Sequence, residues 1–218
     1  MENEILLIDK PDGMTSFGVV ARVRRKLSEK VGKKIKVGHT GTLDPFATGL
    51  LILLIGKGTK RSNDFLKLDK KYEATIRLGA RSTTGDIEGE ITGVDCEAPS
   101  DDVIKKVVQS FVGEIEQRVP NFSAVKINGE RAYKLARKGV EVEMPVRKVK
   151  IYDIEVKGYC WPELKIACHV SSGTYIRTLG EDMGEKLGVG GYLTELRRTE
   201  VGKYKVSEAT TLEDFMNS

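Results

Sequence analysis

The sequence that decides the fold is GHTGTLDPFATGLLILLI, which runs from Gly38 to Ile55. Its first part, up to Gly49, holds three glycines and a proline and is therefore predicted to be a loop. Its second part, from Leu50, is a continuous apolar run that predicts a strand. Within the loop, Asp44 is fixed by Pro45 behind it, and the glycines allow close approach to the backbone, which suits a carboxylate beside an incoming ligand. The alternative is structural, because Asp-Pro also starts turns and caps helices.

On both sides of this stretch, apolar residues follow either the two-residue period of strands or the spacing of helices. Strands are predicted at residues 4–8, 72–78, 149–156 and 164–170. Helices are predicted at residues 16–31, with Ser16 as the N-cap, and at 100–111, 130–138 and 174–187. The irregular order of these elements predicts an α+β fold, and no repeat or linker clearly divides the chain into two domains.

The composition is that of a globular protein. The chain has 218 residues, of which 39% are hydrophobic and 31% charged, and its longest apolar run is far too short to cross a membrane. No secretory signal is visible at Met1, so a cytoplasmic protein is expected. The three cysteines have no CxxC spacing and only two histidines beside them, which predicts buried, reduced thiols and no metal site.

The net charge of +4 is too small to name a partner, but the charges are segregated. Residues 22–36 hold eight basic residues and one acidic residue, and residues 57–71 and 126–150 are also basic. Residues 86–102 hold seven acidic residues and no basic one, and residues 85–100 are predicted to form an exposed excursion. Basic segments that converge in space favour a nucleic-acid binder, whereas the simpler interpretation is a solvated surface.

Four separated blocks, at residues 10–16, 38–49, 71–86 and 172–199, carry a resemblance to a known family. In order and spacing they resemble the TruB family of RNA pseudouridine synthases, and the resemblance extends from Glu4 to Phe215. It implies the pseudouridine synthase fold, a mixed, largely antiparallel central sheet with flanking helices, over residues 1–218. Bacterial members usually continue into a small PUA-type domain, and since only 19 residues follow Thr199, that domain is expected to be missing or vestigial.

The resemblance also implies an activity: the cofactor-free isomerisation of uridine to pseudouridine at position 55 in the TΨC loop of tRNA. The implied partner is the tRNA TΨC stem-loop, with no metal, no membrane and no protein partner indicated. One alternative is the guide-RNA-dependent branch of the same superfamily. Another is an RNA-binding or RNA-folding module in which catalysis is secondary or lost.

Three residues match the family's catalytic positions. Asp44 is implied to be the catalytic carboxylate, either attacking the base or ribose or assisting elimination, and it must be ionised in each case. Arg177 is implied to be its positive partner, since a guanidinium lowers the pKa of a nearby carboxylate and can orient it. Tyr72 is implied to stack on the target base and to reach it with its hydroxyl.

Three further matches concern binding of the substrate. His39 is implied to fill space around the flipped nucleotide. Tyr175 and Leu196 are implied to wall the pocket, although both also fit apolar helical patterns and could be core residues.

Four further basic residues, Lys10, Lys126, Arg197 and Arg198, are not counted as catalytic. Lys10 is expected to tie the first strand to the Asp44 loop, with a phosphate contact as the alternative. Arg197 and Arg198 are interpreted either as contacts to the RNA backbone or as structural ties.

Overall fold

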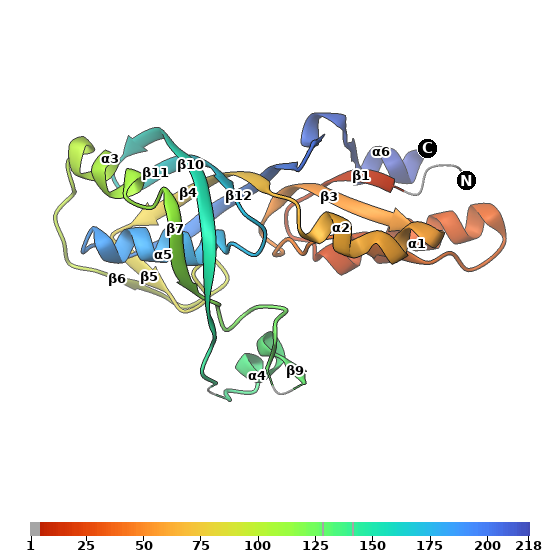
Figure 1. The fold of residues 1–218 in the computed structure, drawn as a ribbon, viewed down its shortest axis with the longest axis horizontal. Coiled ribbons are helices and arrows are strands. Elements are labelled where there is room, and N and C mark those ends of the chain that lie inside the picture. The colour runs from red at the N-terminus through yellow and green to blue at the C-terminus, as the bar shows by residue number, and fades with distance from the viewer. Residues whose placement is uncertain (1–4, 128, 141) are drawn as a thin grey trace. The chain divides into compact units, whose positions relative to one another are not determined.

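The structure is a computed structural model that describes residues 5–127, 129–140 and 142–218. The chain forms two compact units (Figure 1). Unit 1 comprises Met1–Glu73 and Glu195–Ser218, and unit 2 comprises Ala74–Thr194. The chain passes from one unit to the other within β4 (Lys70–Leu78) and again within β12 (Gly191–Val201).

Unit 1 is built around a sheet in the order β14-β1-β3-β12, with β2 beside β3 and β13 beside β12. The pairs β1–β3 and β2–β3 are antiparallel, whereas β3–β12 and β1–β14 are parallel. Its elements are β1 (Ile5–Lys10), α1 (Ser16–Val31), β2 (Val37–His39), β3 (Thr48–Ile55), η1 (Gly56–Arg61), α2 (Ser62–Leu66), β13 (Tyr204–Lys205), η2 (Val206–Glu208), β14 (Thr210–Thr211) and α6 (Leu212–Asn217).

Strand β3 is central to unit 1 because it is apolar on both faces. The alternate residues Leu51, Leu53 and Ile55 pack in a core with the apolar face of α1. The intervening residues Leu50, Ile52 and Leu54 pack in a second core with residues from α2 and β12. Successive side chains of a strand point to opposite faces, so the continuous apolar run fills two cores and the predicted strand is confirmed.

Helix α1 begins where the sequence predicts, but its N-cap is Thr15 and not Ser16. The Thr15 side chain accepts a hydrogen bond from the Gly18 amide at 3.0 Å. Ser16 is instead buried, and its hydroxyl bonds the backbone of Leu43. The prediction of Ser16 as the cap is wrong because a long-range contact uses its hydroxyl, while its neighbour supplies the same cap chemistry.

Unit 2 is built around a sheet in the order β12-β4-β11-β10-β7, in which β10 pairs antiparallel with both β11 and β7. Helices α3 and α5 contact each other, with α3 also against β10 and α5 against β7. The elements of unit 2 are β5 (Ala80–Ser82), β6 (Ile91–Gly93), α3 (Asp101–Gln109), β7 (Gly113–Arg118), β8 (Lys126–Ile127), β9 (Glu130–Arg131), α4 (Ala132–Arg137), β10 (Val146–Cys160), β11 (Glu163–Val170) and α5 (Ile176–Lys186).

The fold class is therefore confirmed: an α+β protein with a mostly antiparallel sheet and flanking helices. Among the described residues, no helix is both long and apolar enough to cross a bilayer. No disulfide joins the three cysteines, all of which lie in the described part of the chain, but only Cys168 is buried, since Cys96 is half-buried and Cys160 is exposed. Cys160 ends strand β10, where its side chain reaches solvent, so the prediction of three buried thiols is wrong.

Candidate active site

Asp44 lies in the loop of residues 40–47 between β2 and β3, in unit 1. Its neighbours Leu43, Phe46 and Ala47 are buried, whereas Asp44 itself is half-buried. The Ala47 amide donates to the Asp44 carbonyl at 3.1 Å, which closes a tight turn. The apolar residues thus anchor the loop in the core and present the carboxylate near the surface, where a ligand can reach it.

Two side chains from the first block of the sequence hold the backbone on either side of Asp44. The Ser16 hydroxyl donates to the Leu43 carbonyl at 2.9 Å and accepts from the Leu43 amide at 2.8 Å. The ammonium of Lys10 donates to the carbonyl of Pro45 at 3.0 Å. Because the residues before and after Asp44 are both fixed, the backbone that carries this carboxylate is in place before any substrate arrives.

Lys10 is a structural tie, which confirms the first interpretation of this residue. Its side chain is completely buried, and besides Pro45 it donates to the carbonyls of Pro11 at 2.8 Å and Met14 at 2.6 Å. An ammonium has three donors, and all three meet backbone carbonyls. A phosphate contact by Lys10 is therefore not supported.

Arg198 braces the same loop from β12. Its guanidinium, which is buried, donates to the carbonyl of Leu50 at 2.8 Å and to the carbonyl of Gly41 at 3.1 Å. Arg197 is more exposed and binds the carboxylate of Asp9 through two nitrogens, at 3.1 and 2.7 Å. Both arginines thus make structural ties within unit 1.

Gly49 lets β12 approach the end of the Asp44 loop. Its φ is +99°, and a Cβ there would lie 2.8 Å from the backbone nitrogen of Arg198 in β12. We expect Gly49→Ala to lower the free energy of unfolding by at least about 3 kcal/mol, against about 1 kcal/mol for Gly32→Ala. Gly32 is the matched control, since its φ is +71° but no atom lies within 4 Å of its Cβ position. Urea unfolding of both variants measures the difference, and equal losses would contradict the role of this close approach.

Three other predicted site residues also belong to unit 1. His39 ends β2, and its Nδ1 accepts from the Gly41 amide at 3.4 Å, so its ring is oriented by the same loop. Tyr72 in β4 and Leu196 in β12 are both buried. Unit 1 therefore contains the candidate carboxylate together with three of the residues predicted to surround the target base.

The two remaining predicted residues, Tyr175 and Arg177, belong to unit 2, at the start of α5. The side-chain amide of Gln117 accepts from the Tyr175 amide at 3.0 Å and donates to its carbonyl at 3.2 Å. The ring of Tyr175 packs on a small core that includes Val119 and Met144. Tyr175 is thus held through both its backbone and its side chain.

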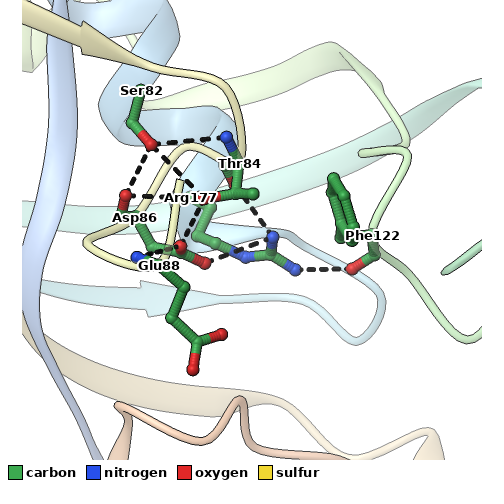
Figure 2. Close-up of polar contacts among 6 residues, drawn as sticks. All are labelled: Ser82, Thr84, Asp86, Glu88, Phe122 and Arg177. Atoms are coloured by element: carbon green, nitrogen blue, oxygen red, sulfur yellow. Dashed lines mark hydrogen bonds and ion pairs between the residues drawn. The ribbon is translucent and has the colours of Figure 1, made fainter. Parts of the chain in front are cut away.

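Arg177 is a buried arginine in a dense polar network (Figure 2). Its guanidinium donates to the carbonyls of Thr84 at 2.9 Å and Phe122 at 2.8 Å. It also lies 3.4 Å from the carboxylate of Asp86, and the two side chains are only 5% and 3% exposed. A guanidinium carries five N–H donors, so these contacts are compatible with a further carboxylate partner.

Asp86 is a member of the Arg177 network that the sequence did not predict. Its carboxylate accepts from the Glu88 amide at 3.0 Å and from the Thr84 hydroxyl (Figure 2). The acidic segment that it begins was predicted to be exposed, and this is wrong for Asp86, which is buried. The physical reason is its pairing with Arg177, since a buried carboxylate needs a cation and hydrogen-bond donors.

Glu181, one turn after Arg177 on α5, is a second acidic residue beside this network. Burial raises its pKa to about 7, partly opposed by Arg177, while Asp182, Asp86 and Glu185 raise it further. The neighbouring Asp182 has its pKa raised to about 6, again mainly by burial. A Cβ on Gly85 would lie 2.8 Å from the Glu181 carboxyl group, so the chain packs closely on it.

A raised pKa in the folded state means that ionisation of Glu181 opposes folding. The stabilisation that the protonated form of Glu181 gives is complete below the unfolded-state pKa of 4.5 and is lost as the pH rises through the folded-state pKa of about 7. We therefore expect Glu181→Gln to stabilise the protein more at pH 8 than at pH 5, as measured by urea unfolding. Glu130→Gln is the control, since Lys138 lowers the pKa of Glu130 and its effect should be the same at both pH values. An effect of Glu181→Gln that does not grow with pH would contradict the prediction.

Comparisons with known proteins show the family of the chain. Residues 24–176 match the N-terminal domain of the TruB family of pseudouridylate synthases, and residues 177–218 match the tRNA pseudouridylate synthase B C-terminal domain. The chain belongs to the TruB family. The resemblance drawn from the sequence blocks is thereby confirmed.

Two TruB relatives show how far the similarity extends. The tRNA pseudouridine synthase B of Aquifex aeolicus (strain VF5) is 46% identical over 216 residues, which cover 98% of this chain and 73% of the relative. The protein of the same name from Phocaeicola vulgatus (strain ATCC 8482) is 46% identical over 219 residues, which cover 98% of this chain and 92% of the relative.

Solved structures also resemble the chain. Its fold matches one chain of a Cbf5-Nop10-Gar1 complex with a TM-score of 0.74 and 32% identity, over 98% of this chain and 53% of that chain. It matches a chain of an H/ACA RNP bound to a substrate RNA containing 2′-deoxyuridine with a TM-score of 0.71 and 30% identity, over 98% of this chain and 52% of that chain. This TruB chain thus spans about half the length of the chains in those assemblies.

Proposed function

We propose that the protein is a tRNA pseudouridine synthase that isomerises uridine 55 in the TΨC loop, with Asp44 as the catalytic carboxylate. The observation that carries this proposal is the fixed backbone on both sides of Asp44, at Leu43 and at Pro45. A carboxylate held in this way is suited to chemistry at one defined atom of a substrate. The relatives named tRNA pseudouridine synthase B support the same activity.

The isomerisation breaks the bond between C1′ of the ribose and N1 of uracil and joins C1′ to C5. The hydrogen of C5 leaves as a proton and N1 gains one, so atoms and electrons balance without an oxidant or a cofactor. Asp44 acts in its ionised form, either as the nucleophile or as the base that assists elimination. Tyr72 stacks on the base and moves a proton with its hydroxyl, while His39 fills space around the flipped nucleotide.

Arg177 is proposed as a positioning residue for Asp44, with Tyr175 and Leu196 as walls of the base pocket. The fixed network around Arg177 supports this role, because Asp86 and two carbonyls hold the guanidinium in one orientation. A rigid cation can lower the pKa of the carboxylate that it faces and fix its direction.

The proposed partner is the TΨC stem-loop of tRNA, and the proposed location is the cytoplasm. In unit 2, the segment of β9 and α4 extends away from the sheet (Figure 1) and carries several basic side chains, namely Arg131, Lys134, Arg137 and Lys138. Cations on a projecting segment suit the phosphates of an RNA stem.

The guide-RNA-dependent activity is the second candidate, since the fold also matches a chain of an H/ACA RNP bound to a substrate RNA and a chain of the Cbf5-Nop10-Gar1 complex. The identity is 32% to that chain but 46% to the relatives named tRNA pseudouridine synthase B. The stand-alone activity on tRNA is therefore the better supported of the two.

Release of tritium from tRNA transcript labelled at C5 of uridine tests the proposal directly. With purified protein alone, we expect one equivalent of tritium per transcript, and none from a transcript in which cytidine replaces uridine 55. No release from the first transcript would contradict the proposal. Release that requires a guide RNA and accessory proteins would support the second candidate.

A further inference from the structure

The exposed side of α1 and the loop after it carry a cluster of cations that the candidate active site does not use. A cavity of about 350 Å³ opens on it and is lined by Ala21, Arg22, Arg24, Arg25, Ser28 and Lys34. Four of these six residues are cationic and none is acidic. Within the described part of the chain, no salt bridge to a carboxylate neutralises any of the four. We call these four residues the α1 basic cluster.

A second cavity, of about 570 Å³, shares Arg22 and Arg25 with the first. Its lining includes two acidic residues, Asp9 and Glu213. The carboxylate of Asp9 is already bound by Arg197, at 3.1 and 2.7 Å. Arg22 and Arg25 are thus the two cations that line both cavities.

We propose that the α1 basic cluster binds the phosphodiester backbone of the RNA substrate, next to the nucleotide that reacts at Asp44. This inference rests on the proposed function. Arg22 and Arg25 are three residues apart, so their side chains are neighbours on one face of the helix. Two neighbouring guanidinium forks can each bind a phosphate through paired hydrogen bonds.

The connection of α1 to the catalytic loop places this surface beside the reaction. Ser16, in the first turn of α1, bonds the backbone of Leu43 at 2.8 and 2.9 Å, and Leu43 precedes Asp44. Arg22 follows Ser16 by six residues, about 9 Å along the helix axis. An RNA whose target base reaches Asp44 can therefore extend its backbone to the α1 basic cluster.

An exposed aromatic ring favours RNA over an acidic protein segment as the occupant. Phe17 is 63% exposed, and the guanidinium of Arg24 lies 5.9 Å from the centre of its ring. An exposed ring gives an unpaired nucleobase a surface on which to stack, and a nucleotide supplies both the base and the phosphate for such a pair. An acidic peptide would supply the charge alone.

Binding of unlabelled tRNA transcript to the Arg22→Ala, Arg25→Ala double variant tests the inference. At low salt we expect the Kd to rise at least about tenfold. We expect the slope of log K against log salt to become less steep by about 1.4 to 1.8, which is the loss of two phosphate contacts. The control is Lys105→Ala, Lys106→Ala on α3, which removes the same charge from a helix of unit 2 and should leave Kd and slope unchanged.

The Arg22→Gln, Arg25→Gln variant keeps most of both side chains and should give the same loss, which guards against misfolding of the alanine pair. Phe17→Leu should weaken binding about fivefold without changing the salt slope. An unchanged Kd and slope in both double variants would overturn the inference and leave an acidic protein as the occupant. Because this test measures binding, its outcome is independent of the tritium assay. A wild-type protein that binds through Arg22 and Arg25 but releases no tritium would refute the proposed function alone.

Discussion

Replacing Asp44 with asparagine is expected to lower the rate of isomerisation by more than about 10⁴-fold, because the amide can neither act as a nucleophile nor accept a proton. The loop should keep its shape, since Ser16 and Lys10 hold it through the backbone of Leu43 and Pro45. Affinity for tRNA should stay the same or rise slightly, because the change removes a negative charge near phosphates. Single-turnover tritium release, together with binding of unlabelled transcript, measures both effects.

The matched control for Asp44→Asn is Asp64→Asn. Asp64 is an exposed aspartate of unit 1 that pairs with Arg61 at 3.7 Å, so the same chemical change there should leave rate and affinity unaltered. A residual rate of Asp44→Asn within tenfold of the wild type would refute the assignment of Asp44 as the catalytic carboxylate.

Replacing Arg177 with lysine is expected to have the second largest effect, a loss of at least about 10²-fold in kcat. The guanidinium binds the carbonyls of Thr84 and Phe122 and the carboxylate of Asp86 from one plane. An ammonium is a point charge that cannot make these contacts together, so a cation should remain near the site but lose its orientation. KM should change much less than kcat if Arg177 positions Asp44 and does not bind RNA.

Arg81→Lys is the control for Arg177→Lys, because Arg81 also holds a carboxylate through two nitrogens, at 2.6 and 2.9 Å from Glu185, but is exposed. The pH dependence of kcat separates positioning from general stability. A less well oriented cation should raise the apparent pKa of the essential carboxylate, so the acidic limb of the profile should move to higher pH. A fully active Arg177→Lys variant would contradict the positioning role. So would a loss of kcat that is no larger than the fraction of the variant that is unfolded.

The sequence predicted the strand and the helix around Asp44 well, because the pattern of apolar residues that specifies each of them lies within the element itself. The run from Leu50 to Ile55 is apolar at every position, and helix α1 repeats its apolar residues at helical spacing. The choice between Thr15 and Ser16 as the cap was not local. Both hydroxyls can cap a helix, and only the distant backbone of Leu43 decides that Ser16 is used elsewhere.

Asp86, the partner of Arg177, shows more clearly what the sequence alone could not predict. Asp86 begins a segment rich in acidic residues, and composition alone assigned that whole segment to the surface. Its burial depends on Arg177, 91 residues away, and no periodicity or spacing connects the two. A signal was present, since Thr83 to Asp86 belongs to one of the four blocks that resemble the TruB family, but the resemblance gave it no role.

Unit 1 is discontinuous in the chain, and this has a consequence for folding during synthesis. Residues up to Glu73 leave the ribosome first, yet Arg198, which braces the Asp44 loop at Gly41, is made only after all of unit 2. Unit 2 is continuous and can fold as soon as it emerges, whereas unit 1 must wait for its last strand. The contact of Arg198 with the Asp44 loop is therefore among the last to form in the nascent chain. Newly made protein should acquire protection from proteases in unit 2 before it acquires activity.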